Sequence, residues 1–109
     1  HPRWGFSWEG FAMEQVIGAT EAEQDAYFYR THAGAELDLL IIRGGKRYGF
    51  EFKFEDAPKP TRSMHVAMDD LKLERIWVVH GGSRSLPLAE GISTLPLGRI
   101  AEAKREMET

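Results

Sequence analysis

The segment ELDLLIIRGGKRYGFEFKFE, residues 36–55, sets the architecture that we expect for this chain. Two runs rich in apolar, β-branched and aromatic residues flank Gly44-Gly45-Lys46, a pattern that predicts a β-hairpin with strands at 36–43 and 47–55. If the two glycines form a two-residue turn, counting outward along the strands puts Asp38 directly across from Glu51. A four-residue turn keeps this parity, whereas a three-residue turn would send the two carboxylates to opposite faces.

The expected hairpin gathers three charged side chains on one face. Alternation along the second strand places Lys53 on the same side as Glu51 and the neighbouring phenylalanines on the other side. Two carboxylates at about 5 Å repel by roughly 3 kcal/mol at an effective dielectric near 20, so Asp38 and Glu51 favour a proton or a cation between them. Mg²⁺ or Mn²⁺ meets that need, because Mg²⁺ prefers oxygen ligands and is often held by only one or two carboxylates with water and phosphate oxygens.

This arrangement predicts phosphodiester hydrolysis. Asp38 and Glu51 would bind the metal, helped by the carbonyl of Phe52, and Lys53 would position the attacking water or stabilise the charge that develops on the phosphate. The same side chains fit a second interpretation, in which they are cross-strand charge pairs on a solvated sheet face. An acid followed later by Glu-x-Lys is a short pattern that many unrelated strands satisfy, so both interpretations stay open at this point.

The segments around the hairpin extend the pattern in both directions. Ser7 is a reasonable N-cap for a helix over 7–17 that carries Glu14, and residues 27–31 predict a first strand. Downstream, Thr61 or Ser63 can cap a helix whose apolar stripe lies at 64, 67, 68 and 71. Residues 76–80 predict a strand parallel to the Glu51 strand. Residues 86–88 and 92–97 predict short edge strands, and 99–107 a terminal helix. The expected fold class is α/β (α+β), with an αβββαβ core and a mixed central sheet flanked by helices.

Several segments together resemble a known family. They are GFAMEQVI (10–17), YFYR (27–30), ELDLLI (36–41), GFEFK (49–53), APK (57–59) and ISTLPL (92–97). With the αβββαβ order, the chain resembles the PD-(D/E)xK superfamily of restriction-endonuclease-like folds, with Asp38 and Glu51-x-Lys53 where that superfamily has its signature. Glu14 matches the extra helical acid of some members. The resemblance narrows to the family of domain of unknown function 4143, the C-terminal domain behind the ATP-binding domain of many bacterial and archaeal AAA-type ATPases.

The resemblance implies a nuclease-like domain accessory to an AAA-type ATPase. Asp38 and Glu51 would hold Mg²⁺ or Mn²⁺, Lys53 would assist hydrolysis, and Glu14 would hold a metal-bound water. The rival expectation is a catalytically inactive nuclease-fold module that binds DNA or a partner protein, because relatives in this superfamily have kept the fold as a scaffold. A third expectation is a homodimer formed through Trp4, Phe6 or an exposed edge strand.

Candidate substrate contacts are Arg30, Lys46 and Arg47. The latter two, together with Arg43, mark the hairpin tip and could flank a nucleic-acid backbone or form an ordinary solvated rim. For Arg30, a contact to phosphate competes with an ion pair to Glu36, which we favour. The formal net charge of −3 argues against a strong non-specific DNA binder.

Length and composition limit the remaining choices. The 109 residues predict a single domain spanning 1–109, and there is no cysteine for disulfides, thiolate metal sites or a cysteine nucleophile. No apolar run approaches the roughly 20 residues that span a bilayer, so we expect a soluble, cytoplasmic protein without a membrane partner. The chain begins at His1-Pro2 and carries no Gly-x-x-x-x-Gly-Lys-Ser/Thr loop, which leads us to expect the C-terminal fragment of a larger ATPase.

Overall fold

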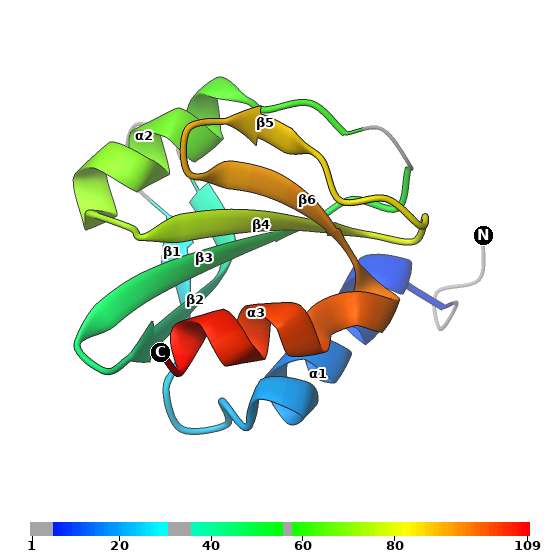
Figure 1. Cartoon of the computed structure of the whole chain (residues 1–109), viewed down its shortest axis with the longest axis horizontal. Coiled ribbons are helices and arrows are strands. Elements are labelled where there is room, and N and C mark those ends of the chain that lie inside the picture. Colours follow the sequence, from blue (N-terminus) through cyan, green and yellow to red (C-terminus); the bar gives the residue numbers. More distant parts are fainter. Residues whose placement is uncertain (1–5, 31–35, 56–57) are drawn as a thin grey trace.

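The computed structural model describes residues 6–30, 36–55 and 58–109. The helices in these residues are α1 (Trp8–Thr20), α2 (Arg62–Leu71), the short 3₁₀ turn η1 (Leu97–Arg99) and α3 (Ile100–Met107). The strands are β1 (Ala26–Arg30), β2 (Glu36–Arg43), β3 (Lys46–Phe52), β4 (Arg75–His80), β5 (Pro87–Ala89) and β6 (Ile92–Pro96). They form one mixed sheet with the order β1-β2-β3-β4-β6-β5 (Figure 1). The expected mixed α+β architecture is confirmed, while Trp4 lies outside the described residues.

The β2–β3 hairpin has the predicted two-residue turn. Arg43 pairs with Lys46, and Gly44 and Gly45 have φ angles of +62° and +77°. Positive φ at both central positions is the requirement of a type I′ turn, which glycine meets without steric cost. The second strand differs from the prediction at its far end, because β3 ends at Phe52 and Lys53 lies just beyond it.

Beyond the hairpin the sheet continues in parallel. In β3, Glu51 lies opposite Val78 of β4, and β4 in turn runs parallel to β6. The prediction of an edge strand at 92–97 is wrong, since β6 lies between β4 and β5. Burial explains its place, because four of its five residues are buried, as an inner strand requires.

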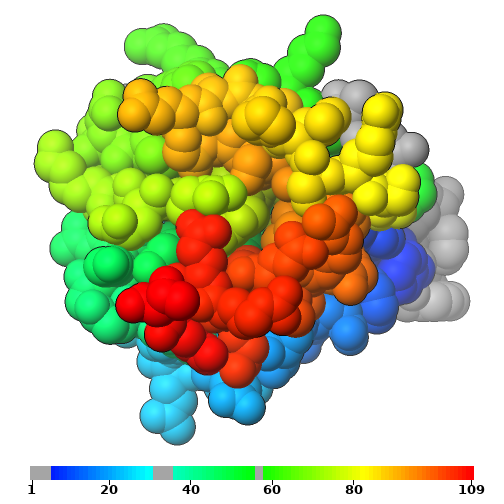
Figure 2. Space-filling model, viewed as in Figure 1, coloured from blue at the N-terminus to red at the C-terminus, as the bar shows by residue number. Residues whose placement is uncertain are grey.

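Helices cover both faces of the sheet. One apolar cluster joins α1 and α3 to side chains such as Phe50 and Trp77, and a second joins α2 to side chains such as Ile76 and Val78. Figure 2 shows α3 in red across the middle of the face in view, between the β5–β6 strands above and α1 below. Within the described part of the chain, every helix is too short or too polar to span a bilayer.

The predicted helix starts are confirmed by their caps. The Ser7 hydroxyl accepts a hydrogen bond from the Gly10 N–H at 3.2 Å, and the Thr61 hydroxyl accepts one from the Met64 N–H at 3.2 Å. Each bond satisfies an amide that has no partner inside its helix. The stripe predicted on α2 is also confirmed as core, because Met64 and Ala67 are buried and the other two members pack against the same cluster.

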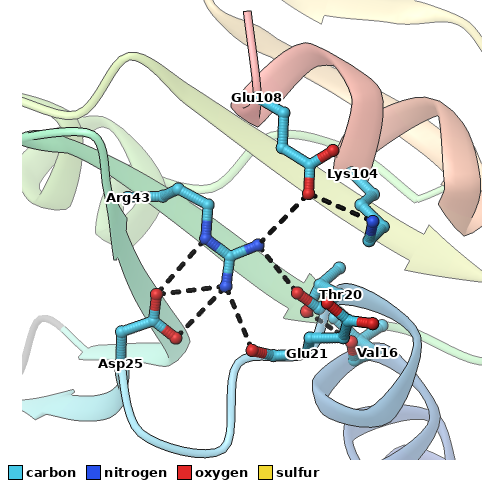
Figure 3. Close-up of polar contacts among 7 residues, drawn as sticks. All are labelled: Val16, Thr20, Glu21, Asp25, Arg43, Lys104 and Glu108. Atoms are coloured by element: carbon cyan, nitrogen blue, oxygen red, sulfur yellow. Dashed lines mark hydrogen bonds and ion pairs between the residues drawn. The ribbon is translucent and has the colours of Figure 1, made fainter.

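Arg43 ties three distant segments together (Figure 3). Its guanidinium donates to the carbonyl oxygens of Thr20 at 2.7 Å and Glu21 at 3.3 Å, and it forms an ion pair with Asp25 at 3.0 Å. A longer ion pair at 3.9 Å reaches Glu108 after α3. The sequence left Arg43 either flanking a nucleic-acid backbone or on a solvated rim, but these contacts commit its donors to the end of α1 and to two carboxylates.

Gly49 of β3 lies where the sheet meets α2. A Cβ at this position would come within 3.0 Å of methyl carbons of Leu37 and Leu73 and within 3.1 Å of Ile76. We expect Gly49→Ala to lower the free energy of unfolding by about 1–3 kcal/mol, because these side chains must shift out of a packed cluster. Urea unfolding would measure the change. Gly18→Ala in α1 is the control, since an added methyl there meets no atom within 4 Å and should stabilise the helix by up to about 1 kcal/mol.

Candidate active site

The acidic pair lies where the β2–β3 ladder ends. The last backbone pairing joins Leu39 and Phe50, one residue short of Asp38 and Glu51. Beyond that point carboxylates replace backbone acceptors: the Asp38 N–H donates to Glu51 Oε2 at 2.8 Å, and the Phe52 N–H donates to Asp38 Oδ2 at 3.0 Å. These reciprocal bonds confirm the predicted register and hold the two carboxylates beside each other.

Glu51 is buried, and its surroundings disfavour its charge. Burial is the main cause that raises the pKa of Glu51 to about 7, and the negative charges of Asp38 and Glu36 add to the shift. The hydrogen bond from the Asp38 amide and the positive charge of Lys53 act in the opposite direction. The carboxyl group therefore keeps its proton to a higher pH than an ordinary glutamate, and an opposite charge beside it would favour its ionised form.

A β-bulge on β2 coincides with Asp38. Tyr27 of β1 pairs with Leu40, and Tyr29 pairs with Leu37. Between these two pairs β2 advances by three residues while β1 advances by two. Leu37 and Leu39 consequently pack into the two different clusters, on opposite faces of the sheet. Simple alternation along β2, which would put Glu36 and Asp38 on one face, therefore does not hold across the bulge. Bulges of this kind re-aim side chains and are common beside active sites.

A hollow of about 390 Å³ opens beside Asp38. Its lining comes from α1 (Met13), β1 (Phe28, Tyr29, Arg30) and β2 (Glu36, Leu37, Asp38). Phe28 has 76% of its surface exposed, an unusual value for a phenylalanine in a strand. The sequence pattern carries no signal for Met13 or Phe28, because their meeting depends on how α1 packs against the sheet.

Lys53 follows β3 directly. Its backbone N–H donates to the Val79 carbonyl at 2.9 Å, which continues the parallel pairing by one residue beyond the strand. The side chain is half-buried, and its charge acts on Glu51. The structure therefore places Asp38 and Glu51 side by side, with Lys53 two residues beyond Glu51 and its charge lowering the pKa of that carboxyl group.

The other predicted site residues lie apart from this group. Glu14 is exposed on α1, and the α1 side chain that lines the hollow is the preceding Met13. Lys46 and Arg47 lie at the opposite end of β3, about 17 Å and about 14 Å along the strand from Glu51 at about 3.4 Å per residue. Across residues 6–30, 36–55 and 58–109 there is no group of three or more His, Cys, Asp or Glu side chains placed to hold one metal ion.

Arg30 makes the predicted ion pair with Glu36. The two charged groups are 2.8 Å apart, and both side chains are exposed at the rim of the hollow. Ser63 of α2 anchors the same point of β2, because its hydroxyl accepts from the Glu36 N–H at 2.9 Å. An exposed pair of this kind contributes little to stability, so Arg30 can exchange its partner at low cost.

A mixed α+β domain with an acidic pair at the open end of a hairpin is thus the class that the fold and the site define. The chain belongs to the DUF4143 family, a domain of unknown function whose model matches residues 4–100. Uncharacterised proteins of Mycobacterium bovis and Mycobacterium tuberculosis are each 40% identical over 100 residues, which covers 92% of this chain and 22% of each relative. The chain thus spans about a fifth of the length of these curated relatives. No solved structure matches it.

Proposed function

We propose that this domain is a Mg²⁺- or Mn²⁺-dependent nuclease of the PD-(D/E)xK superfamily that hydrolyses phosphodiester bonds. We further propose that it is the C-terminal accessory domain of an AAA-type ATPase. The observation that carries the proposal is the pair Asp38–Glu51, held by reciprocal amide–carboxylate bonds beside Lys53. A restriction-endonuclease-like core would place this group at the end of the hairpin where the strands part.

The residues present fit a hard divalent cation. Each carboxylate uses one oxygen to accept a backbone N–H, and among the described residues its second oxygen accepts no hydrogen bond. Two such oxygens, with the Phe52 carbonyl as a further candidate ligand, match the sparse protein coordination that Mg²⁺ accepts. When bound, the ion would lower the pKa of a water and stabilise charge on the phosphate.

The chain's own groups would complete the chemistry. The bond to Val79 fixes the backbone at Lys53, and the charge of its side chain acts on Glu51; in the proposed mechanism its ammonium group would neutralise a phosphate oxygen or orient the attacking water. Glu51 would lose its proton as the cation binds. Arg30, at the rim of the hollow, would exchange Glu36 for a backbone phosphate.

A non-catalytic binding module is the second candidate function. It is favoured by the position of Glu14, which is exposed on α1 and makes no hydrogen bond to the acidic pair within the described residues. In this case the fold would bind DNA or a partner protein for the ATPase. The carboxylates of Asp38 and Glu51 would then serve only to accept backbone hydrogen bonds where the β2–β3 pairing ends.

Plasmid nicking separates the two functions. With Mn²⁺ and supercoiled plasmid, we expect the wild type to nick the DNA and Lys53→Ala to be slower by at least about 100-fold, the typical cost of one lost charge-stabilising donor. Arg105→Ala removes an exposed cation on α3, a helix that contributes no residue to the proposed site, and should nick at the wild-type rate. Cleavage that survives in Lys53→Ala would contradict the assigned site, and no cleavage together with no Mn²⁺ binding would favour the binding module.

A further inference from the structure

Phe28 is the most exposed of the large hydrophobic side chains in the described residues. It lies on the edge strand β1 and lines the hollow that also contains Asp38. Its neighbour Tyr27 faces Leu40 and is not part of that lining. A phenyl ring with 76% of its surface in water gains little from folding, and its open face stands beside the proposed scissile position.

The charges of the domain disfavour a duplex as the ligand. Duplex binding depends on Lys and Arg side chains that neutralise phosphates, and the net charge here is −3. Several of the cations are also held in internal ion pairs, namely Arg43–Asp25, Arg75–Glu106, Arg99–Glu102 and Lys104–Glu108. Affinity must therefore come from another source, and an exposed aromatic ring offers base stacking.

Stacking requires a base whose face is free. In a duplex each base is covered by its neighbours and shows only its edges in the grooves, whereas an unpaired base can lie flat on an aromatic side chain. The hollow, at about 390 Å³, lies at the lower end of the range of small-ligand pockets and suits one nucleotide unit. Its lining places that unit against Phe28 and the adjoining phosphate near Asp38.

We propose that Phe28 is a stacking platform for an unpaired base and that the substrate of this site is single-stranded nucleic acid, or an unpaired segment of a longer one. The inference rests on the proposed nuclease function and names its substrate class. Phe28 acts by positioning: the base on its ring places the next phosphodiester beside Asp38, Glu51 and Lys53.

Fluorescence anisotropy tests the inference without hydrolysis. The probes are a labelled 12-nucleotide DNA strand of mixed sequence, the same sequence in RNA, and the blunt DNA duplex, in low salt with EDTA. We expect at least one of the single strands to bind about tenfold more tightly than the duplex. Phe28→Leu, which keeps apolar bulk but has no aromatic face, should lose roughly tenfold in affinity for that strand.

Two controls isolate the ring. Phe28→Tyr retains the aromatic face, and Tyr27→Leu removes the neighbouring ring outside the hollow, so both should bind within about twofold of the wild type. Equal binding of duplex and single strands, or wild-type affinity in Phe28→Leu, would overturn the inference. Because Phe28 is exposed, each variant should show the circular dichroism of the wild type, which checks that it is folded.

The same proteins separate this inference from the proposed function. Plasmid nicking that depends on Lys53, without tighter binding of single strands, would overturn the stacking role of Phe28 and support the nuclease function. Single-strand binding that depends on Phe28, without cleavage of any probe in Mn²⁺, would contradict the nuclease function and support a single-strand-binding module. Phe28-dependent binding with Lys53-dependent cleavage of the same strand supports both, and the DNA and RNA probes identify the sugar.

Discussion

Glu51→Gln should make the domain more stable at pH 8 by about 3 kcal/mol while abolishing Mn²⁺ binding and Mn²⁺-dependent cleavage. The pKa of Glu51 in the folded chain is raised from the ordinary value of 4.5 to about 7, and each pKa unit corresponds to about 1.36 kcal/mol. Glutamine is neutral at every pH, and its side-chain oxygen can still accept the hydrogen bond from the Asp38 N–H. The variant therefore keeps the geometry of the pair and removes the buried charge.

The sign of the pH dependence follows from linkage. Between pH 4.5 and about 7 the folded state binds more protons at Glu51 than the unfolded chain, so stability falls as the pH rises. The stabilisation from the bound proton is fully present below pH 4.5 and is lost as the pH passes through about 7. Urea unfolding from pH 5 to 8 should show this decline in the wild type and a flatter profile in Glu51→Gln.

Controls for this result use metal and a second acid. Mn²⁺ at pH 8 should restore stability to the wild type alone, because a cation that binds only the folded state stabilises it by mass action. Glu55→Gln changes an exposed acid shortly after β3 and should follow the wild-type profile. Parallel profiles for the wild type and Glu51→Gln would show that another group carries the pH dependence.

The second large effect is expected at Arg43. Replacing Arg43 with Met should lower the free energy of unfolding by about 3 kcal/mol, because it leaves Asp25 and the last carbonyls of α1 without their shared donor. Only 18% of the Arg43 side chain is exposed, so water replaces these partners poorly. Urea unfolding with an unchanged m-value would measure the loss.

The matched control is Arg30→Met. It breaks the ion pair to Glu36, in which 78% and 52% of the two side chains are exposed, so the cost should stay below about 1 kcal/mol. A loss equal to that of Arg43→Met would contradict the claim that burial, and not the number of ion pairs, sets the difference. Arg43→Lys should also destabilise, because one ammonium group cannot reproduce the planar fork that serves Thr20, Glu21 and Asp25 together.

The hairpin could be predicted because its determinants are local. Two adjacent glycines allow a type I′ turn, the turn fixes the register, and the register puts Asp38 across from Glu51. The caps Ser7 and Thr61 are equally local, since each interacts with an amide three residues away. These features survive in the folded chain because the tertiary structure reinforces them.

Features that depend on distant segments could not be predicted in the same way. Every residue from Leu37 to Ile42 except Asp38 is apolar. The sequence pattern therefore carries no sign of the bulge. Arg43 looked like a free cation at the hairpin tip, yet its partners come from residues 20–25 and from Glu108. The inner position of β6 likewise follows from its pairing with β4, which its short sequence does not specify.

The reciprocal bonds of Asp38 and Glu51 also bear on how such a domain evolves. Each carboxylate accepts a backbone N–H hydrogen bond where the β2–β3 pairing ends, and the side-chain amide oxygen of Asn or Gln can accept the same bond. Asp to Asn and Glu to Gln each need one nucleotide change, and at Glu51 the change relieves a buried charge. Under the proposed function, loss of cleavage at this site would therefore favour folding, so a lineage without selection for cleavage would drift toward a non-catalytic scaffold, and selection for metal binding would be needed to keep both acids in place.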